Sequence, residues 1–461
     1  MKTHHLWRPL ALALAFALAG CSLDVGDLNN ASTDELESDP SIAAVIAAAT
    51  GLLIGHRERI ADQNGYIALT GVLGREAYNL NVETDARFVS EMLKGDALDP
   101  GSPRFGGNFW ADRYANIRNA NVLLDAVEKV PLAAADKAAL RGYARTIQAL
   151  DYLLVVSTRD GEGVVLDVAR PFGAPLAPIR CRDAALAFIG DLLDEADAEL
   201  AMAGEVFPVP LSSGFAGFDT PATFRAFNRA IRARAAVYAG DGEAALDALE
   251  GSFLVVDEAD PRLDLGVYHV FGTSAGDTRN GLTDPNIYAH PSVVEAAVDG
   301  DQRLARKVRA VSGEADDPAK IIAEEGIEAR HKFTLYPSAT TPVPIIRNEE
   351  LVLLRAEAHL LAGDLGAAAD DLNYIRRVSG GLTDRDDLTA EGAIVDELLY
   401  NRFLSLLFEG GHRWIDMRRY DRLDLLPRDA EDHAVHAYFP IPTAERDARG
   451  IPAGEAIDCE P

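Results

Sequence analysis

The sequence predicts a mostly α-helical protein with one loop-rich insertion. After Ser41 the chain consists mainly of Ala-, Leu-, Arg- and Glu-rich segments with apolar residues at helical spacing. Strand-like runs are few and short, the clearest being 163–168 and 267–271. One helical segment occurs twice, at 239–249 and 362–372. These three observations together predict the fold class.

Four segments in the first half of the chain show the helical period most clearly. They are SIAAVIAAATGLLIGHRERI, FWADRYANIRNANVLLDAVEKV, KAALRGYARTIQALDYLLVVS and CRDAALAFIGDLLDEADAELAMA. In the second, residues at spacings of three and four line one face: Trp110, Tyr114, Ile117, Asn121 and Leu124. A stripe of this kind predicts that each helix packs against further helices.

The repeated segment predicts helical hairpins. AGDGEAALDAL and AGDLGAAADDL share the order Ala-Gly-Asp-x-x-Ala-Ala-x-Asp-x-Leu. Gly240 and Gly363 are expected to end one helix, and Asp241 and Asp364 to cap the next. The small residues allow close helix packing, and the pattern resembles the tetratricopeptide repeat. Such helix pairs are expected at about 140–250 and 347–380, without forming a continuous array.

Residues 251–345 separate the two copies and differ from them in composition. This segment is rich in Gly, Pro, Asp and Thr, as in GTSAGDTRNGLTDPNIYAHP and YPSATTPVPI. A long insertion in a helical scaffold usually carries recognition, so it is predicted to lie on the ligand side. The alternative is a poorly ordered excursion.

The N-terminus MKTHHLWRPLALALAFALAGC predicts an exported lipoprotein. Basic residues precede an apolar run that is too short to span a bilayer, so residues 1–20 are predicted to be a signal peptide. The sequence Leu-Ala-Gly-Cys at its end resembles the lipobox of bacterial lipoproteins, with Cys21 as the palmitate-bearing residue. The alternative is an ordinary cleaved signal followed by a chance cysteine. Lipid is the expected membrane anchor, since no later apolar run is long enough.

Charge and cysteine content restrict the partners and the compartment. The formal net charge of −29 repels phosphate backbones and argues against nucleic-acid binding. The other cysteines, Cys181 and Cys459, can pair in an oxidising envelope. Sequence alone leaves that pairing open.

Several patterns imitate catalytic sites without their usual context. Residues 272–276 fit G-x-S-x-G, but the sequence that follows Ser274 does not begin a helix promptly, which disfavours a hydrolase. His433 and His436 lack the glutamate of a zinc helix and are predicted to be solvated loop histidines. The acids Asp370 and Asp371 are likewise predicted to be solvated. No metal site and no cofactor is predicted.

The C-terminal third carries the most specific pattern. It contains RNEELVLLRAEAHLLAGDLGAAADDLNYIRRVSGG, then ELLYNRFLSLLFEGGHRWIDMRRY, then YFPIPTAE. This order resembles the signature of SusD/RagB-like outer-membrane lipoproteins, and FWADRYANIRNANVLLD is similar to that family's third helix. The resemblance implies a single SusD-like domain over residues 21–461. Two departures are the apolar residues at 404–407 and one additional residue at Gly411-His412.

The stretch EGGHRWIDMRRY is interpreted as structural and not as a catalytic cluster. Arg413 and Asp416 are three residues apart on a helix and can pair with each other or with neighbouring helices. Trp414 supplies apolar area to the core. Asp416 can also pair with Arg419, with Arg418 turned away.

The resemblance implies a binding protein and not an enzyme. It implies a lipid-anchored protein of the outer membrane, on its extracellular face, that captures an oligosaccharide or a peptide. The implied partner is a TonB-dependent SusC-like transporter to which the nutrient is delivered. The competing reading is a tetratricopeptide scaffold lipoprotein for envelope assembly without a small-molecule ligand.

Candidate ligand contacts are aromatic, amide and charged residues of the expected ligand side. Sugars pack their C–H faces on aromatic rings and hydrogen-bond through their hydroxyls. The candidates are Tyr78, Asn81, Asp85, Arg87 and Phe88 before the third helix, and Tyr268, Phe271, Tyr288 and Tyr336 in the insertion.

Overall fold

The computed structural model describes residues 33–83, 85–95, 97–102, 108–170, 173–452 and 454–461. The predicted signal peptide and the lipidation site Cys21 lie outside these residues. Among the described helices, none has both the length and the apolar character needed to cross a bilayer.

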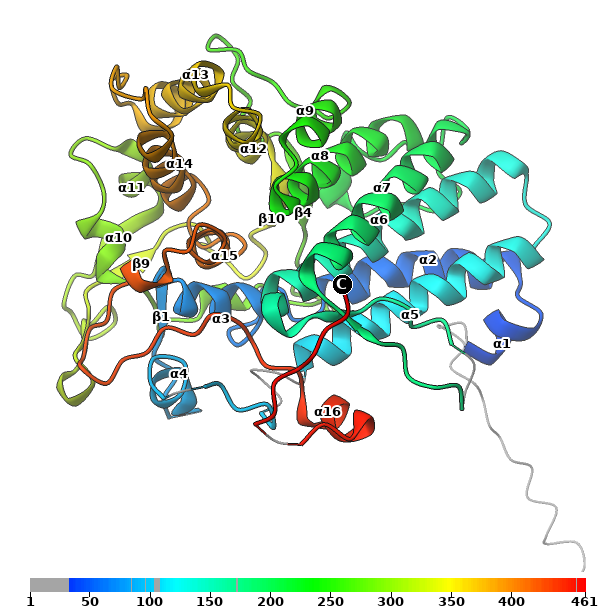
Figure 1. Cartoon of the computed structure of the whole chain (residues 1–461), viewed down its shortest axis with the longest axis horizontal. Helices are drawn as coiled ribbons and strands as arrows, with labels where there is room; N and C mark the ends of the chain where they lie inside the picture. Colours follow the sequence, from blue (N-terminus) through cyan, green and yellow to red (C-terminus); the bar gives the residue numbers. More distant parts are fainter. Residues whose placement is uncertain (1–32, 84, 96, 103–107, 171–172, 453) are drawn as a thin grey trace, which may run out of the picture.

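Long helices that pack in chain order form one side of the molecule (Figure 1). They are α2 (Ile42–Arg57), α5 (Asn108–Lys129), α6 (Ala134–Arg159), α7 (Arg182–Ala201), α8 (Pro221–Ala239) and α9 (Gly242–Glu250). Each helix from α5 to α8 packs against the next one in the sequence. The prediction of a mostly α-helical fold is confirmed.

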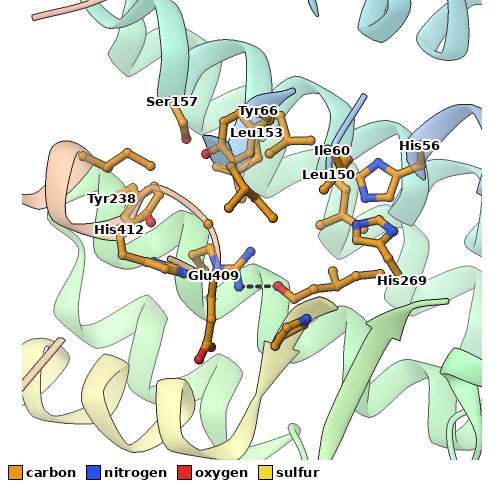
Figure 2. A pocket seen from close by; sticks show the side chains of 17 residues that line it. His56, Ile60, Tyr66, Leu150, Leu153, Ser157, Tyr238, His269, Glu409 and His412 are labelled. Carbon is orange, nitrogen blue, oxygen red and sulfur yellow. Dashed lines mark hydrogen bonds between the residues drawn. The ribbon is translucent and has the colours of Figure 1, made fainter. Parts of the chain in front are cut away.

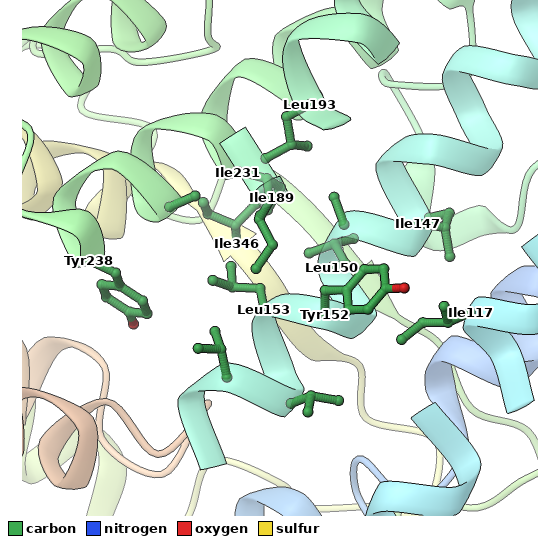
Figure 3. Packing of buried hydrophobic residues seen from close by; sticks show 14 of the residues in the cluster. Ile117, Ile147, Leu150, Tyr152, Leu153, Ile189, Leu193, Ile231, Tyr238 and Ile346 are labelled. Carbon is green, nitrogen blue, oxygen red and sulfur yellow. The ribbon is translucent and has the colours of Figure 1, made fainter. Parts of the chain in front are cut away.

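The main core lies where these helices meet strand β10 (Val343–Arg347). Figure 3 shows Ile147, Leu150 and Leu153 of α6 beside residues of α7, α8 and β10. All of these apolar side chains are buried. Burial of one such side chain stabilises the fold by roughly 1.5–3 kcal/mol, so this seam fixes the helices against the strand.

Both copies of the repeated segment form helical hairpins as predicted. Gly240 has a φ of +78° after α8, and the Asp241 side chain accepts a hydrogen bond of 2.9 Å from the backbone N–H of Ala244. Helices α12 (Asn348–Leu361) and α13 (Leu365–Ile375) are joined in the same way: Gly363 has a φ of +81°, and Asp364 accepts from Ala367. Helix α9 packs on α12, so the two distant copies are neighbours.

The remaining helices surround this scaffold. They are α1 (Thr33–Ser38), α3 (Tyr66–Leu73), α4 (Arg87–Ser90), α10 (Pro291–Glu295), α11 (Gln302–Lys307), α14 (Glu391–Ser405), α15 (His412–Arg419) and α16 (Thr443–Arg449), with the π-helical turn η6 (Arg376–Gly380). Short 3₁₀ turns are η2 (Asp160–Glu162), η3 (Ser213–Phe215), η4 (Gly281–Thr283), η5 (Ala323–Glu325) and η7 (Leu423–Leu425).

The insertion contains more regular structure than its composition suggests. Three of its strands, β5 (Ile287–Ala289), β9 (His331–Phe333) and β6 (Val308–Ala310), extend β1 (Ala77–Asn79) into an antiparallel sheet of order β1-β5-β9-β6. Strand β4 (Gly266–His269) pairs with β10. Two further hairpins are β2 (Val164–Val165) with β3 (Ile179–Arg180), and β7 (Lys320–Ile322) with β8 (Ile327–Ala329). These short strands are only weakly predicted by their own sequences, and pairing with strands from other parts of the chain stabilises them.

A disulfide joins Cys181 to Cys459, with the two Cα atoms 5.0 Å apart. The C-terminal segment also adds a parallel bridge beside β3, because Glu460 donates its N–H to Ile179 and accepts from Cys181. The pairing that the sequence left open therefore anchors the end of the chain at the start of α7.

Candidate functional site

Strands β1 and β5 bring two of the candidate segments together. Tyr78 lies opposite Tyr288 in the antiparallel pairing, although the two residues are 210 positions apart in the sequence. Both rings are buried, and the Tyr288 hydroxyl donates to the carbonyl of Pro318 at 3.0 Å. Phe88 is buried as well. In this structure these three rings pack inside the protein and offer no open face to a ligand.

The polar candidates near β1 bind one another. Asn81 donates to the Asp284 carboxylate at 3.0 Å and accepts from Asn286 at 2.9 Å. The Arg87 guanidinium donates two hydrogen bonds, of 3.0 and 2.9 Å, to the Asp85 carboxylate. These contacts connect the segment before α5 to the insertion, and they occupy the groups that a ligand would use.

Tyr268 and Tyr336 line a pocket of about 370 Å³, which we call the Tyr268 pocket. Its size is within the range of about 300–1,000 Å³ typical of small-molecule sites. The lining residues are Leu263, Asp264, Tyr268, Arg306, Lys307, Leu335, Tyr336, Pro342, Pro344, Arg347, Glu349, Ser379 and Glu409.

Strands β4 and β10 form one wall of this pocket. Tyr268 lies opposite Pro344, next to a register shift in the β4–β10 pair. Its hydroxyl donates to the carbonyl of Asp264 at 2.6 Å, and the Tyr336 hydroxyl donates to that of Phe408 at 2.8 Å. Burial raises the pKa of Tyr268 to about 12, so the hydroxyl stays protonated. The two tyrosines therefore contribute rings to the wall while their hydroxyls are fixed.

Charged groups at the bottom of the pocket form a paired network. Arg347 donates to both carboxylate oxygens of Glu409, at 2.8 and 3.0 Å. Lys307 lies 3.0 Å from the same carboxylate, and both cations also donate to the carbonyl of Ser405. Glu349 accepts from Arg347 and from the hydroxyl of Ser379, each at 2.5 Å. All four charged side chains are buried.

Mutual pairing keeps these acids ionised despite their burial. Burial alone would raise the pKa of Glu349, but Arg347, Lys307 and the Ser379 hydroxyl lower it to about 2. The pKa of Glu409 is also lowered, because the same two cations outweigh the effect of burial. At neutral pH the four charged side chains at the bottom of the Tyr268 pocket are therefore all ionised and already paired with one another.

The Tyr268 pocket as a whole is electrically balanced. Three cations, Arg306, Lys307 and Arg347, face three carboxylates, Asp264, Glu349 and Glu409. Such a pocket offers aromatic surface and hydrogen-bonding groups without net charge. This arrangement suits a neutral ligand with many hydroxyl groups.

Residues 257–451 match the sequence model of the SusD family. This segment includes the Tyr268 pocket and every element from α12 to α16. This part of the chain is SusD/RagB-like.

Solved SusD-like structures share the fold at low sequence identity. A SusD-like carbohydrate-binding protein from Bacteroides fragilis has a TM-score of 0.66 at 15% identity, covering 90% of this chain and 99% of that chain. A SusD superfamily protein from Bacteroides vulgatus gives 0.64 at 16%, covering 88% and 97%. A laminarin-binding SusD-like protein gives 0.60 at 17%, covering 87% and 96%. A search of curated proteins found no significant match.

The signature residues of this SusD-like protein lie in its core. Trp414 is fully buried, and its Nε1 donates to the carbonyl of His436 at 2.8 Å. Asp416 pairs with Arg402 at 2.9 Å and with Arg419 at 3.2 Å. Arg418 turns away and stacks over the Trp414 ring at 4.7 Å. These contacts agree with the structural interpretation of EGGHRWIDMRRY.

Of the two alternatives for Arg413 and Asp416, pairing with each other does not occur, and both side chains bind other elements. Arg413 donates to the carbonyl of Arg75 at 2.8 Å and to the Ser292 hydroxyl at 3.0 Å, with its guanidinium 3.8 Å from the Phe403 ring centre. Gly411, with a φ of +72°, is the N-cap of helix α15. The first turn of α15 directs Arg413 toward the α3–β1 connection, whereas Asp416 faces Arg402 on α14.

The apolar departure at 404–407 supplies core side chains, since Leu404, Leu406 and Leu407 are all buried. The next residue, Phe408, stacks on Phe333 with ring centres 4.3 Å apart. The end of α14 and the residues that follow it therefore pack into the core and against the β-sheet of the insertion.

Two of the residue-level predictions were wrong about exposure. His433 and His436 are buried, and His436 donates to backbone carbonyls of Glu91 and Lys94. Asp371 is buried against Arg355, with hydrogen bonds of 2.6 and 2.9 Å. Backbone carbonyls distant in sequence satisfy His436, and Arg355 satisfies Asp371, whereas the ring nitrogens of His433 make no hydrogen bond within the described residues. The part of the chain that the structure describes contains no cluster of metal-ligating side chains.

Ser274 lies on an exposed bend and not between a strand and a helix. Its backbone N–H is held by Asp277 at 3.0 Å. The strand-turn-helix context of a nucleophile elbow is therefore missing at this position.

A small cavity of about 60 Å³ lies behind the β4–β10 wall (Figure 2). Buried histidines His56, His269 and His412 line it, and Arg234 donates to the Ile345 carbonyl at 2.7 Å beside it. Burial lowers the pKa of His412 to about 4, so this imidazole is neutral at physiological pH. The cavity is too small for a saccharide, and Phe271 lies outside it near Arg57.

Sequence reasoning missed the pocket floor. Arg347 and Glu409 were recognised only as parts of the family signature, and Lys307 was not singled out. The pairing of β10 with β4 brings Arg347 to Tyr268, and the contacts of Glu409 with Arg347 and Lys307 complete the group.

Proposed function

We propose that this SusD-like protein binds a neutral oligosaccharide in the Tyr268 pocket and delivers it to a TonB-dependent outer-membrane transporter. The observation that carries the proposal is the charge balance of a pocket with two tyrosine rings in its walls. Neutral sugars gain from ring stacking and from hydrogen bonds, and they need no counter-charge. The laminarin-binding SusD-like relative supports the same ligand class.

In this proposal the protein binds and does not catalyse. The buried acids beneath Tyr268 are fixed by cations, so neither is free to exchange a proton with a substrate at neutral pH. Binding, followed by release to a transporter, requires only this preorganised surface.

Calorimetric titration with neutral oligosaccharides, beginning with laminarihexaose and continuing through a glycan array, tests ligand binding. Tyr268→Ala is expected to weaken the binding at least about tenfold, or about 1.4 kcal/mol. Tyr438→Ala is the matched control, because Tyr438 is an exposed tyrosine outside the pocket. Equal loss in both variants, or retention of short peptides and no sugar on the arrays, would contradict a glycan site at Tyr268.

We also propose that the mature protein is anchored by lipid at Cys21 on the outer face of the outer membrane. The lipobox-like end of the signal peptide supports this placement. Radiolabelled palmitate should enter the wild-type protein and not a Cys21→Ser variant, and externally added protease should digest the anchored protein on intact cells. Protection from protease would place it in the periplasm.

The proposed transporter can be identified by purification of the native protein from outer membranes. Co-purification of a large TonB-dependent barrel is the expected result. If the protein instead brings down envelope-assembly factors and no barrel, the scaffold reading replaces the uptake proposal.

A further inference from the structure

A third pocket, of about 230 Å³, opens where helix α2 meets β4 and the segment 210–215. We call it the Arg57 pocket. It adjoins the 60 Å³ cavity, with which it shares His56, His269 and Ile345. The lining residues are Thr50, Leu53, Ile54, His56, Arg57, Pro210, Leu211, Ser212, Phe215, Tyr268, His269, Val270 and Ile345.

The walls of the Arg57 pocket are mainly apolar. Leu53 and Ile54 come from α2, Phe215 from η3 and Ile345 from β10. Ile54 is 56% exposed and therefore lies at the mouth, whereas Phe215 is buried. Such walls favour the non-polar part of a ligand, because its burial removes apolar surface from water.

Arg57 is a cation without a carboxylate partner. Its Nη1 donates to the carbonyl of Val270 at 2.5 Å, and its guanidinium lies 5.8 Å from the Phe271 ring centre. Among the residues that the structure describes, Arg57 forms no ion pair, and its Nε and Nη2 make no hydrogen bond. A guanidinium group binds a carboxylate through two of its N–H groups at once, so these donors suit an acidic group.

The acids nearest to Arg57 in the sequence belong to a different group. Arg59 pairs with Asp112 at 2.7 Å. Burial and the charge of Glu58 raise the pKa of Asp62, and Arg59 offsets part of that effect. These acids therefore gather around Arg59, and the lining of the Arg57 pocket itself contains no carboxylate.

Two buried imidazoles line the pocket, side by side in Figure 2, with 5.2 Å between their ring centres. His56 donates through Nδ1 to Asp151 at 2.8 Å, and Asp151 also accepts from Arg113 at 2.8 Å, so this acid is already balanced. The Nε2 of His56 and both ring nitrogens of His269 make no hydrogen bond within the described part of the chain, yet surrounding atoms do not seal them off. They are therefore available to a ligand.

His269 is neutral at physiological pH. Burial lowers its pKa well below 6.5, and the positive charges of His56, Arg113 and Arg57 lower it further. A neutral imidazole donates from one ring nitrogen, so His269 can donate a hydrogen bond to an oxygen of a ligand. Charges that oppose the protonation of His269 favour an anion at the same place.

We propose that the Arg57 pocket binds a small carboxylic acid with an apolar body. Arg57 pairs with the carboxylate through its free N–H groups, and His269 donates a further hydrogen bond. The apolar walls cover the body. The protein has a formal charge of −29, so a pocket with an unpaired cation and no lining acid is selective for an anion that reaches it.

This inference does not rest on the proposed oligosaccharide site. Tyr268 lines both the Arg57 pocket and the Tyr268 pocket, and all other lining residues of the two differ. The two ligands also differ in chemistry, one being a neutral polyhydroxyl compound and the other an apolar acid.

Calorimetric titration of the full chain with phenylbutanoate and with phenylbutanamide, which has the same body and no charge, tests the proposal. The acid is expected to bind at least about tenfold more tightly than the amide. Arg57→Gln should weaken binding of the acid about tenfold and leave binding of the amide nearly unchanged, whereas Arg57→Lys should keep most of the preference. Arg118→Gln is the matched control, because Arg118 is exposed on α5 outside the pocket.

A second pair of variants alters the exposed mouth, where a substitution disturbs the fold least. Ile54→Glu should weaken binding of the acid about tenfold relative to Ile54→Gln, because the added carboxylate repels the ligand. The amide should bind both variants alike. Circular dichroism and the unfolding midpoint show which variants remain folded.

Three results would overturn the inference: equal binding of acid and amide, no binding of the acid, or unchanged binding of the acid in folded Arg57→Gln and Ile54→Glu variants. Arg306 lines the Tyr268 pocket and not the Arg57 pocket. If Arg306→Gln abolishes binding of the acid and Arg57→Gln does not, the acid occupies the Tyr268 pocket, and the second site is rejected. Loss of laminarihexaose binding bears only on the proposed function.

Discussion

Arg347 and Glu409, 62 residues apart in sequence, face each other in a two-pronged ion pair beneath Tyr268. Arg347 is both the last residue of β10 and the N-cap of α12, and Glu409 lies between α14 and α15. The pair therefore joins the pocket wall to the C-terminal helices. Both side chains are buried, so the pair is protected from solvent screening.

Glu409→Gln is expected to destabilise the protein by roughly 3–5 kcal/mol. The substitution leaves Arg347 and Lys307 buried, with Glu349 as the buried carboxylate that balances them and Asp264 as an exposed one. Urea denaturation followed by circular dichroism measures the change in the free energy of unfolding.

The control for this substitution is Glu328→Gln. Glu328 pairs with Arg330, but both side chains are more than half exposed. Exposed pairs contribute about 0–1 kcal/mol, so this variant should unfold almost like the wild type. Similar losses in the two variants would show that burial of the Arg347–Glu409 pair is not what matters.

Glu76→Gln is expected to stabilise the protein at pH 8 relative to the wild type. Glu76 is buried, and among the described residues only the Phe408 N–H, at 3.3 Å, donates to its carboxyl group. Burial raises its pKa from 4.5 to about 8, with Phe408 and Arg413 offsetting part of the effect. In the unfolded chain the group ionises near its ordinary value, so its contribution to stability is full below about pH 4.5 and is lost as the pH rises through 8.

Unfolding curves of both proteins between pH 4.5 and 9 check this prediction. The free energy of unfolding of the wild type should fall relative to that of the variant by an amount on the order of a few kcal/mol. A constant difference across this range would mean that Glu76 is already ionised in the folded protein.

Removal of the disulfide is expected to loosen the C-terminal tail and to lower stability. The bridge spans 278 residues, and loss of a native disulfide typically costs roughly 2–5 kcal/mol. A Cys181→Ser/Cys459→Ser double variant should show a lower unfolding midpoint and earlier proteolysis after α16. Reduction of the wild type should reproduce the effect, and an unchanged midpoint under both conditions would contradict it.

Gly242→Ala is expected to be strongly destabilising, although alanine favours helices. An added Cβ would lie 2.5 Å from the Ala358 carbonyl and 2.8 Å from the Leu361 Cβ, at the contact of α9 with α12. The cost of such overpacking is about 1–3 kcal/mol. At Gly392 in α14 no atom lies within 4 Å, so Gly392→Ala should stabilise by about 0.5–1 kcal/mol. Thermal unfolding of the Gly242→Ala and Gly392→Ala variants tests both predictions. Equal changes in their unfolding midpoints would refute the role of the α9–α12 contact.

The helical hairpins could be predicted from sequence because their signal is local. Gly240 and Asp241 occupy adjacent turn and cap positions, and Gly363 and Asp364 repeat them. Backbone conformation and capping depend on neighbours within a few residues, so a repeated pattern is sufficient evidence.

The sheet of the insertion and the candidate site could not be predicted in the same way. The sequence predicts Tyr78 and Tyr288 as ligand contacts because each is an aromatic residue in a polar segment. Their pairing across β1 and β5 buries both, and nothing within either segment indicates that partner. Tyr268 faces a pocket only because β10 supplies the opposite strand.

Charged residues near the C-terminus illustrate the same limit. The sequence identified Asp416 as part of an ionic network, but a distance of three residues also suggested Arg413 as its partner. The orientation of α15 after Gly411 decides between the two, and that orientation is a tertiary property.

Strand β10 passes into helix α12 without a single intervening residue. The pocket wall is thus continuous with the helical platform, so any hinge between the two must lie in the backbone of Arg347 and Asn348 themselves. Because Glu409 and Glu349 hold Arg347, bending at this point would have to disrupt buried ion pairs.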